Sequence, residues 1–374
     1  MSKVSSNNGA AVYEAWLASA CMPGDLTQSL LSTFKDAERF YHAFSKNEED
    51  SRNKIPPHFI RLLETNGSNE KLRFFEQAMN KHGIGVIRYD DPRYPETLKR
   101  IPDPPAILFY QGEAACLRQR SLGMVGSRAA SYNGQKAARK LAADLSRYGV
   151  SIISGMACGI DAASHMGCLE GGSPTVAVTA CGLDSVYPRD NEGLRDRILK
   201  EGGIILSEYA PGERPLGWHF PVRNRIITGL GRALILMESR IRSGSMTSVQ
   251  HALDQGKDVF VYPGDPGSEQ FEGNHRLLRE GGIYFTSATD ILEDLGWLDN
   301  PPSVGQNSDC AVKTESASPA EAAVLNALKP GTLSFEQLLD ATGMLPGEMM
   351  STLTILQISG RIEALPGKQY QMKQ

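Results

Sequence analysis

The strongest constraint on the fold is the alternation of short apolar runs with helix-length segments between residues 119 and 297. Among these segments, Ala137, Leu141 and Leu145 are spaced to share one face of a helix. The runs VSIISG, TVAVTA, GIILSE, ALILMES and DVFVYPG have the length and composition of buried strands. Strands that alternate with helices form right-handed crossovers, which build a parallel sheet covered on both faces. The pattern therefore predicts a doubly wound α/β domain.

Segments of different character flank this domain. Residues 10–80 show helix-like segments without strand-like alternation, and we interpret them as a small helical domain. The sheet domain is predicted to span residues 83–297. Residues 298–318 are rich in Pro, Ser, Asn and Asp, which is typical of a linker. Residues 319–374 contain three short helical patterns and then two alternating runs, the layout of a winged helix.

The composition restricts the classes of function. The chain has 374 residues, 41% of them hydrophobic, and a formal net charge of -4, so any binding of nucleic acid must be local. Its six cysteines form no C-x-x-C pair, which argues against a disulfide framework and a zinc site. We find neither an apolar leader nor a run of about 18 apolar residues. We therefore expect a cytoplasmic protein with no membrane partner.

Turns rich in glycine and serine follow four of the apolar runs. Because parallel strands end at one edge of a sheet, ligands bind beyond their carboxyl ends. Glycine lets the backbone approach a phosphate, and the next helix offers unpaired N–H groups. One such loop alone is equally well explained as a tight turn. Together the four predict an anion site, and they are VGSRAASYNG (125–134), SGMACGID (154–161), ACGLDSVYPRDN (180–191) and RSGSMTS (242–248).

Common enzyme motifs are absent from these loops. GMVGSRA does not supply the dinucleotide fingerprint G-x-G-x-x-G, and no P-loop motif occurs. Asp161, Asp184, Asp190 and Glu208 form no close acidic pair with a histidine, and Asp161 better fits a helix-capping role. These observations predict no cofactor and no metal site.

The stretch HFPVRNRII lies in the most basic part of the chain. The segment 214–242 contains six arginines and one acid, Glu238, which gives a local net charge of +5. Pro221 restricts Phe220 to an extended backbone, and we expect the next helix to begin at Arg223. The ring of Phe220 is therefore predicted to project from a loop. The six arginines are Arg214, Arg223, Arg225, Arg232, Arg240 and Arg242.

This stretch has two interpretations. Guanidinium groups match phosphate oxygens, and an exposed phenyl ring can stack on an unpaired base, so the pattern favours single-stranded nucleic acid. Alternatively, Phe220 lies in the core, and Arg223 and Arg225 pair with Glu208 and Asp184 to brace the edge of the sheet.

At these residues the sequence resembles the DprA (Smf) family of bacterial DNA-processing proteins. The order and spacing of the shared motifs extend over about the central half of the chain. The motifs are GSR (126–128), SGMACGID (154–161), GLDSVYP (182–188), SEY (207–209), FPVRNRIITGL (220–230), SGS (243–245), VFVYPG (259–264) and GNHRLLREGG (273–282).

The resemblance implies an extended Rossmann-like domain that binds single-stranded DNA, forms a homodimer and delivers incoming strands to the RecA recombinase in natural transformation. It implies no catalysis and no cofactor. The flanking helical (SAM-like) and winged-helix domains are similar to those of longer family members. The residues implied to bind DNA are Ser127, Arg128, Ser154, Gly155, Phe220, Arg223, Asn224 and Arg225, with backbone donors from Ser243, Gly244 and Ser245.

The chain departs from the family pattern at Gly217 and Val222, where several relatives carry basic residues. Two phosphate contacts are therefore expected to be missing. The segment from residue 301 onward contains five basic and seven acidic residues, which gives a net charge of -2. A module that reads duplex DNA is usually basic, so we expect the winged helix to contact protein or to guide the strand.

The alternative from another class is an enzyme that processes nucleotides, a Rossmann-like nucleoside-monophosphate phosphoribohydrolase. Such enzymes bind phosphates with glycine-rich loops and present the motif PGGxGTxxE. The nearest segments here, SGSMTSVQHA and VYPGDPG, lack the motif's glutamate.

Overall fold

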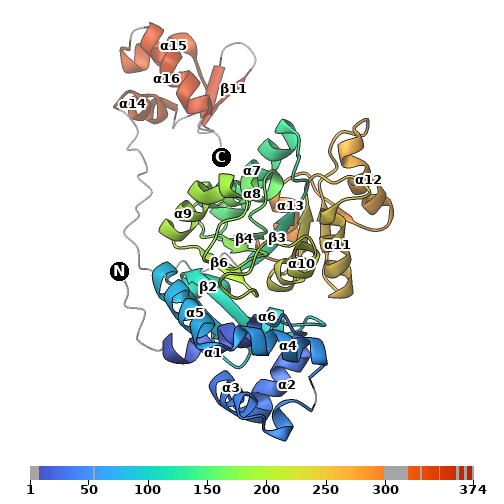
Figure 1. Cartoon of the computed structure of the whole chain (residues 1–374). Helices are drawn as coiled ribbons and strands as arrows, with labels where there is room; N and C mark the ends of the chain where they lie inside the picture. The colour runs from blue at the N-terminus through green and yellow to red at the C-terminus, as the bar shows by residue number, and fades with distance from the viewer. Residues whose placement is uncertain are drawn as a thin grey trace. The chain divides into compact units, whose positions relative to one another are not determined.

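The structure is a computed structural model, and its chain divides into two compact units, residues 1–303 and 304–374 (Figure 1). Within the part of the chain that the structure describes, no helix is long and apolar enough to cross a membrane. The described residues are 8–53, 55–298, 319–328, 331–344, 346–358, 362–365 and 369–372.

In the described part of the first unit, five α-helices precede the sheet. Asp36 caps α3 by accepting from Arg39 N, and Ser68 caps α5 by accepting from Lys71 N. Trp16 is fully buried at their centre, where its Nε1 donates to Leu63 O at 2.8 Å. The helices are α1 (Asn8–Ala18), α2 (Gly24–Phe34), α3 (Ala37–Ser45), α4 (Pro57–Asn66) and α5 (Asn69–His82), with a short η1 (Glu49–Ser51).

A nine-stranded sheet forms the body of the first unit, in the order β1-β2-β6-β5-β4-β3-β7-β8-β9. From β6 to β9 all neighbours are parallel, whereas β2 pairs antiparallel with β1 and β6. The strands are β1 (Gly85–Arg88), β2 (Ile107–Gly112), β3 (Ser121–Val125), β4 (Ser151–Ser154), β5 (Val176–Val178), β6 (Ile204–Ser207), β7 (Leu234–Leu236), β8 (Val259–Val261) and β9 (Ile283–Tyr284).

Helices cover both faces of this sheet (Figure 1). In β7, Ile235 packs into the core beneath α7, α8 and α13, while Leu234 and Leu236 pack into the core on the face of α10 and α11. Successive side chains of a strand point to opposite faces, so a strand with only apolar residues contributes side chains to the core on each face of the sheet. The helices are α6 (Glu96–Lys99), α7 (Tyr132–Arg147), α8 (Ile160–Gly171), α9 (Glu192–Lys200), α10 (His219–Leu230), α11 (Gly244–Asp254), α12 (Glu272–Arg279) and α13 (Ala288–Asp294), with η2 (Ala114–Arg118), η3 (Arg189–Asn191) and η4 (Glu269–Phe271).

The N-terminal helices share a core with the antiparallel edge of the sheet. Trp16 and Phe40 belong to the same buried cluster as Ile107 and Phe109 of β2 and Ile205 of β6. Figure 1 shows these helices, in blue, beside β2. This packing fixes the α1–α2 turn against the loop that precedes β2.

Among its described residues, the second unit has three helices and a three-stranded antiparallel sheet in the order β10-β12-β11. Val324, Leu338 and Leu353 lie in its core. Its elements are α14 (Pro319–Leu328), β10 (Leu333–Ser334), α15 (Phe335–Thr342), α16 (Pro346–Ile358), β11 (Ile362–Leu365) and β12 (Gln369–Met372).

These elements confirm the predicted fold class: a doubly wound, mainly parallel sheet with N-terminal helices and a C-terminal winged helix. The predicted linker, 298–318, lies outside the described residues except for its first residue.

Candidate nucleic-acid interface

The chain reverses its direction of winding between β3 and β7. The crossovers from β3 lead to β4, β5 and β6 on one side, and β7 then returns to the other side of β3. In open α/β sheets such a reversal leaves a crevice beyond the carboxyl ends of the strands. A cavity of about 720 Å³ lies here, and we call it the switch-point pocket. Its walls include Gly126 to Ala129 after β3, the first residues of α10, and Ser243 to Ser245 at the start of α11.

An aromatic ring and a guanidinium group lie together in this pocket. The guanidinium carbon of the exposed Arg128 lies 4.5 Å from the ring centroid of Phe220. The ring of Tyr187 lies 5.7 Å from that of Phe220, and Tyr187 is 45% exposed. Phe220 is half-buried and borders the cavity. The site therefore offers a flat apolar surface next to a cation.

Phe220 is part of a helix, which corrects the prediction that it projects from a loop. Helix α10 begins at His219, so Phe220 and Pro221 occupy its first turn. Proline is tolerated there because N–H groups in the first turn of a helix have no partner within the helix. The helical spacing places Phe220, Arg223 and Asn224 on one side of α10, and all three line the pocket.

Arg223 forms the buried floor of the pocket. Its side chain is 3% exposed, and its Nη1 donates to Gly155 O at 2.7 Å and to Val178 O. A Cβ at Gly155 would lie 2.6 Å from both Arg223 Nη2 and Asp161 Oδ2, so only glycine lets these groups approach. Burial lowers the pKa of Arg223 to about 10, and the charge of Asp161 opposes this shift. Burial likewise raises the pKa of Asp161, against the effect of Arg223.

Three hydroxyl groups join the loop before α11 to the first turn of that helix. Ser239, Ser243 and Ser245 bond to one another through their Oγ atoms at 2.6 to 2.9 Å. Ser243 is the N-cap residue of α11, and its side chain makes no capping hydrogen bond. Asn224 Nδ2 donates to Gly244 O at 3.4 Å and joins this loop to α10. The positive end of α11 is thus available to an anion in the pocket.

The neighbouring helices at this edge are capped by side chains of the protein. Ser131 caps α7 by accepting from Gly134 N, and the buried Glu238 accepts from Ser131 N and Oγ. The first turn of α8 contains Asp161, whose Oδ2 accepts from Ala157 N at 3.3 Å. Of these three helices, α11 therefore offers the N-terminus best suited to an external phosphate.

Two residues implied by the family motifs do not line the pocket. Ser154 is fully buried and donates to Met124 O at 2.7 Å, and Gly155 lies beneath Arg223. Ser154 is the last residue of β4 and Gly155 follows it, and both are buried. They support the floor of the site and do not reach its cavity.

Arg225 also lies away from the pocket, on the other side of α10. Its Nη2 lies 2.7 Å from Glu208 Oε1 and its Nε lies 3.1 Å from Asp103 Oδ2. The bracing interpretation of Arg225 with Glu208 is therefore correct. Asp184, by contrast, accepts from Gly212 N at 2.8 Å.

Arg232 likewise lies outside the basic surface that the sequence suggested. It precedes β7 and pairs with Asp258 at 3.5 Å, at the opposite end of the strands. The run of six arginines therefore does not form one patch.

The structure adds residues to the site that were not among the predicted DNA-binding residues. Tyr187 comes from the loop after β5. Its position beside Pro188 in a polar turn could have indicated an exposed aromatic residue. The other additions include Asp161, Pro215 and Ser248. Among the described residues, no group of three or more His, Cys, Asp or Glu side chains could hold a metal ion.

A doubly wound sheet with a glycine- and serine-lined cavity at its switch point defines a Rossmann-like domain of the class that binds phosphate-bearing ligands. The comparisons with known proteins identify the family. The family described as DNA recombination-mediator protein A matches residues 85–296, and the DprA winged helix domain matches residues 311–368. The chain belongs to the DprA (Smf) family.

Relatives match the chain over most of their own length. The DNA processing protein DprA of Streptococcus pneumoniae is 44% identical over 204 residues, which cover 54% of this chain and 72% of that protein. Protein Smf of Escherichia coli is 34% identical over 286 residues, 75% of this chain and 76% of Smf.

Solved structures of this family share the fold. The X-ray structure of DprA from Streptococcus pneumoniae matches with a TM-score of 0.65 and 34% identity, covering 76% of this chain and 97% of that one. A structure of DprA from Helicobacter pylori, described as showing its single-stranded DNA binding mode, matches with a TM-score of 0.51 and 26% identity, covering 57% of this chain and 95% of that one.

Proposed function

We propose that this protein binds single-stranded DNA in the switch-point pocket. The observation that carries the proposal is the convergence of the Phe220 ring, the Arg128 guanidinium and the N-terminus of α11 in one cavity. A ring stacks readily on an unpaired base, whose face is free, and the other two groups favour phosphate. The single-stranded DNA binding described for the Helicobacter pylori relative supports the same ligand.

The implied DNA-binding residues divide into two groups in this proposal. Ser127, Arg128, Phe220 and Asn224 contact the strand, together with backbone N–H groups of Ser243 to Ser245 at the N-terminus of α11. Ser154, Gly155, Arg223 and Arg225 act instead through the framework, because each bonds to protein groups or lies buried beneath the cavity.

The same proposal includes delivery of the strand to a RecA recombinase, as a homodimer, in the cytoplasm during natural transformation. The family match supports it, because the family is described as recombination mediators. It is tested by following RecA filament formation on DNA coated with single-strand-binding protein. The parent protein should increase the rate of RecA filament formation. At equal concentration, Arg128→Ala should increase that rate less.

We further propose that binding is not coupled to catalysis. Among the described residues that line the pocket, Asp161 is the one carboxylate, and it is buried against Arg223. A phosphoribohydrolase needs an acidic group that can reach its substrate. Incubation with nucleoside monophosphates, followed by chromatography for free base, is expected to show none. Release of base would favour the enzyme instead.

The roles of the flanking segments are also proposals. We propose 10–80, 83–297 and 319–374 as domains, and we assign the winged helix to protein contact or strand guiding because its acidic balance disfavours independent duplex binding. Limited proteolysis should cut first between the last two domains. A winged-helix fragment that binds duplex tightly would contradict this assignment.

Replacement of Phe220 tests the stacking surface. Phe220→Ala should weaken binding of an unpaired strand by about 1 to 3 kcal/mol, the range for loss of one base–aromatic stack. The ring is half-buried at the cavity wall, so the melting temperature should change little. Phe220→Trp should retain most of the affinity. A large fall in melting temperature with unchanged affinity of the folded protein would show that the ring is a core residue.

Gly217 offers a test in the opposite direction. It borders the pocket, it is exposed, and a Cβ added there meets no atom within 4 Å. Gly217→Lys should tighten strand binding up to about fivefold, the range of an exposed ion pair. The slope of log K against log salt should steepen by about 0.7. Gly193→Lys adds the same charge at another open glycine, on α9, and should change neither quantity. Equal gains in both variants would contradict a local contact.

A further inference from the structure

A second cavity lies on the opposite side of α10, and we call it the α2–α10 pocket. Its volume is about 260 Å³. Met22 in the α1–α2 turn, Phe59 on α4 and Ile107 at the start of β2 supply apolar wall. Trp218, the N-cap residue of α10, and Val222 on α10 border it and are 54% and 37% exposed. The pocket thus combines an apolar interior with an accessible indole.

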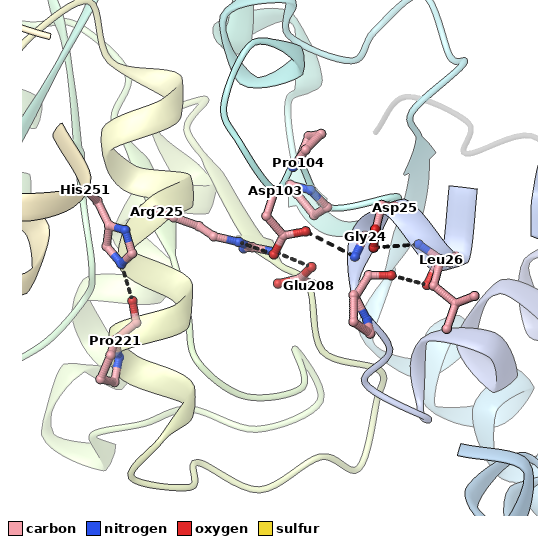
Figure 2. Close-up of polar contacts among 12 residues, drawn as sticks. Gly24, Asp25, Leu26, Asp103, Pro104, Glu208, Pro221, Arg225 and His251 are labelled. Carbon is pink, nitrogen blue, oxygen red and sulfur yellow. Dashed lines mark hydrogen bonds and ion pairs between the residues drawn. The ribbon is translucent and has the colours of Figure 1, made fainter. Parts of the chain in front are cut away.

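The polar side of this pocket is an ion-pair cluster, shown in Figure 2. Arg225 extends from α10 toward Glu208 and Asp103, and Asp103 Oδ1 accepts from Gly24 N at 3.2 Å. Arg225 is 7% exposed, yet its Nη1 has no hydrogen-bond partner. A buried donor without an acceptor is costly and rare in folded proteins. A ligand carbonyl oxygen would supply the missing acceptor once the side chains that cover Nη1 move aside.

The charges of the cluster restrict the ligand. Two carboxylates face one guanidinium, so the pocket carries a net charge of about -1 and disfavours an anion. Glu208 and Asp103 can accept hydrogen bonds from N–H groups, while Arg225 can donate to a carbonyl. A neutral, flat ring with a carbonyl beside a ring N–H meets these requirements. Thymine and guanine have such an edge, and adenine does not.

The two pockets border the same short segment, residues 217–222, at the start of α10. Gly217 and Pro221 line the switch-point pocket, whereas the next residue in each case, Trp218 and Val222, lines the α2–α10 pocket. A strand that leaves the first pocket across this segment reaches the second. We infer that the α2–α10 pocket binds a second unpaired base of the same strand, thymine or guanine, with Trp218 stacked on it. This inference rests on the proposed function of the first pocket.

The test uses a thymidine oligonucleotide trimmed to the shortest length that retains full affinity, so that it binds in one register. One abasic site is placed at each position in turn. With the parent protein, an abasic site should weaken binding at two positions of the oligonucleotide, by about 5- to 150-fold at each. In Phe220→Ala, an abasic site at the first position should no longer weaken binding. In Trp218→Ala, the same should hold for the second position. Adenine at the second position should weaken binding relative to thymine, and Tyr148→Ala, an exposed aromatic on another surface, should leave the scan unchanged.

The outcomes separate this inference from the proposed function. A single sensitive position, abolished by Phe220→Ala, would overturn the second site and leave the first intact. Persistence of two sensitive positions in Trp218→Ala, or equal affinity for adenine and thymine, would overturn the assignment of the second base. Absence of strand binding by the parent would overturn both.

Tryptophan fluorescence gives an independent readout. Of the three tryptophans, Trp16 is fully buried and Trp218 is 54% exposed. Stacking of a base on the Trp218 indole should quench the parent's emission as the strand binds, and Trp218→Phe should remove most of that quenching. Undiminished quenching in Trp218→Phe would contradict the stack.

Discussion

Arg223→Ala is expected to lower the free energy of unfolding by about 3 to 5 kcal/mol, the range for removing one partner of a buried charge pair. The guanidinium is 3% exposed and lies beside the buried Asp161. Its loss removes the larger of the two positive charges that compensate the Asp161 carboxylate, leaving Arg128, and it removes the donor to two carbonyl oxygens, those of Gly155 and Val178. The floor of the switch-point pocket should therefore collapse or unfold.

Denaturant titration followed by circular dichroism measures this change. The double variant Arg223→Ala/Asp161→Ala is the informative control, because it also removes the carboxylate. It should be more stable than Arg223→Ala alone if charge compensation dominates. A single variant within about 1 kcal/mol of the parent, a loss no larger than that of an average point mutation, would contradict the framework role of Arg223.

Arg128→Ala is expected to weaken strand binding by about 1.5 to 3 kcal/mol, the value of a hydrogen bond to a charged group. This corresponds to roughly 10- to 150-fold in dissociation constant. The loss should be similar for every base sequence, because phosphate contacts position a strand without reading it. Stability should be little affected, since the side chain is exposed.

Arg118→Ala is the matched control for charge. Arg118 is equally an exposed arginine, but it lies in η2, outside the switch-point pocket. Titrations at several salt concentrations should show a shallower slope, by about 0.7, for Arg128→Ala alone. Equal losses in both variants would mean that net charge, and not the pocket, determines binding.

The position of the site could be predicted from the sequence because it depends on topology. Apolar strands that end in glycine or serine must meet at one edge of a parallel sheet. Gly126 to Arg128 and Ser243 to Ser245 follow strands β3 and β7, and the structure brings these two loops together in the switch-point pocket.

The side of α10 on which each arginine lies could not be predicted, because it depends on where the helix begins. Pro221 indicated a loop, but the helix begins two residues before it, at His219. Arg223 and Arg225 are two positions apart, about 200° around a helix of 3.6 residues per turn, so they face nearly opposite sides. Phe220, Arg223, Asn224 and Ile227, all lining the pocket, have the i, i+3, i+4, i+7 spacing that could have revealed the face.

Contacts between residues far apart in the sequence could not be predicted either. Asp103, which pairs with Arg225, lies 122 residues earlier, in the loop before β2. Ser154 belongs to a motif that suggested a ligand contact, yet its hydroxyl bonds to β3 within the sheet. Sequence spacing does not distinguish a serine that faces a cavity from one that bonds to the adjacent strand.

The most direct test of the account compares a single strand with a duplex of the same length and sequence, titrated into the full-length protein at several salt concentrations. The switch-point pocket offers a stacking ring that paired bases cannot reach, together with phosphate donors. We expect clearly tighter binding of the single strand, which weakens as salt rises. Equal or tighter binding of the duplex would contradict it.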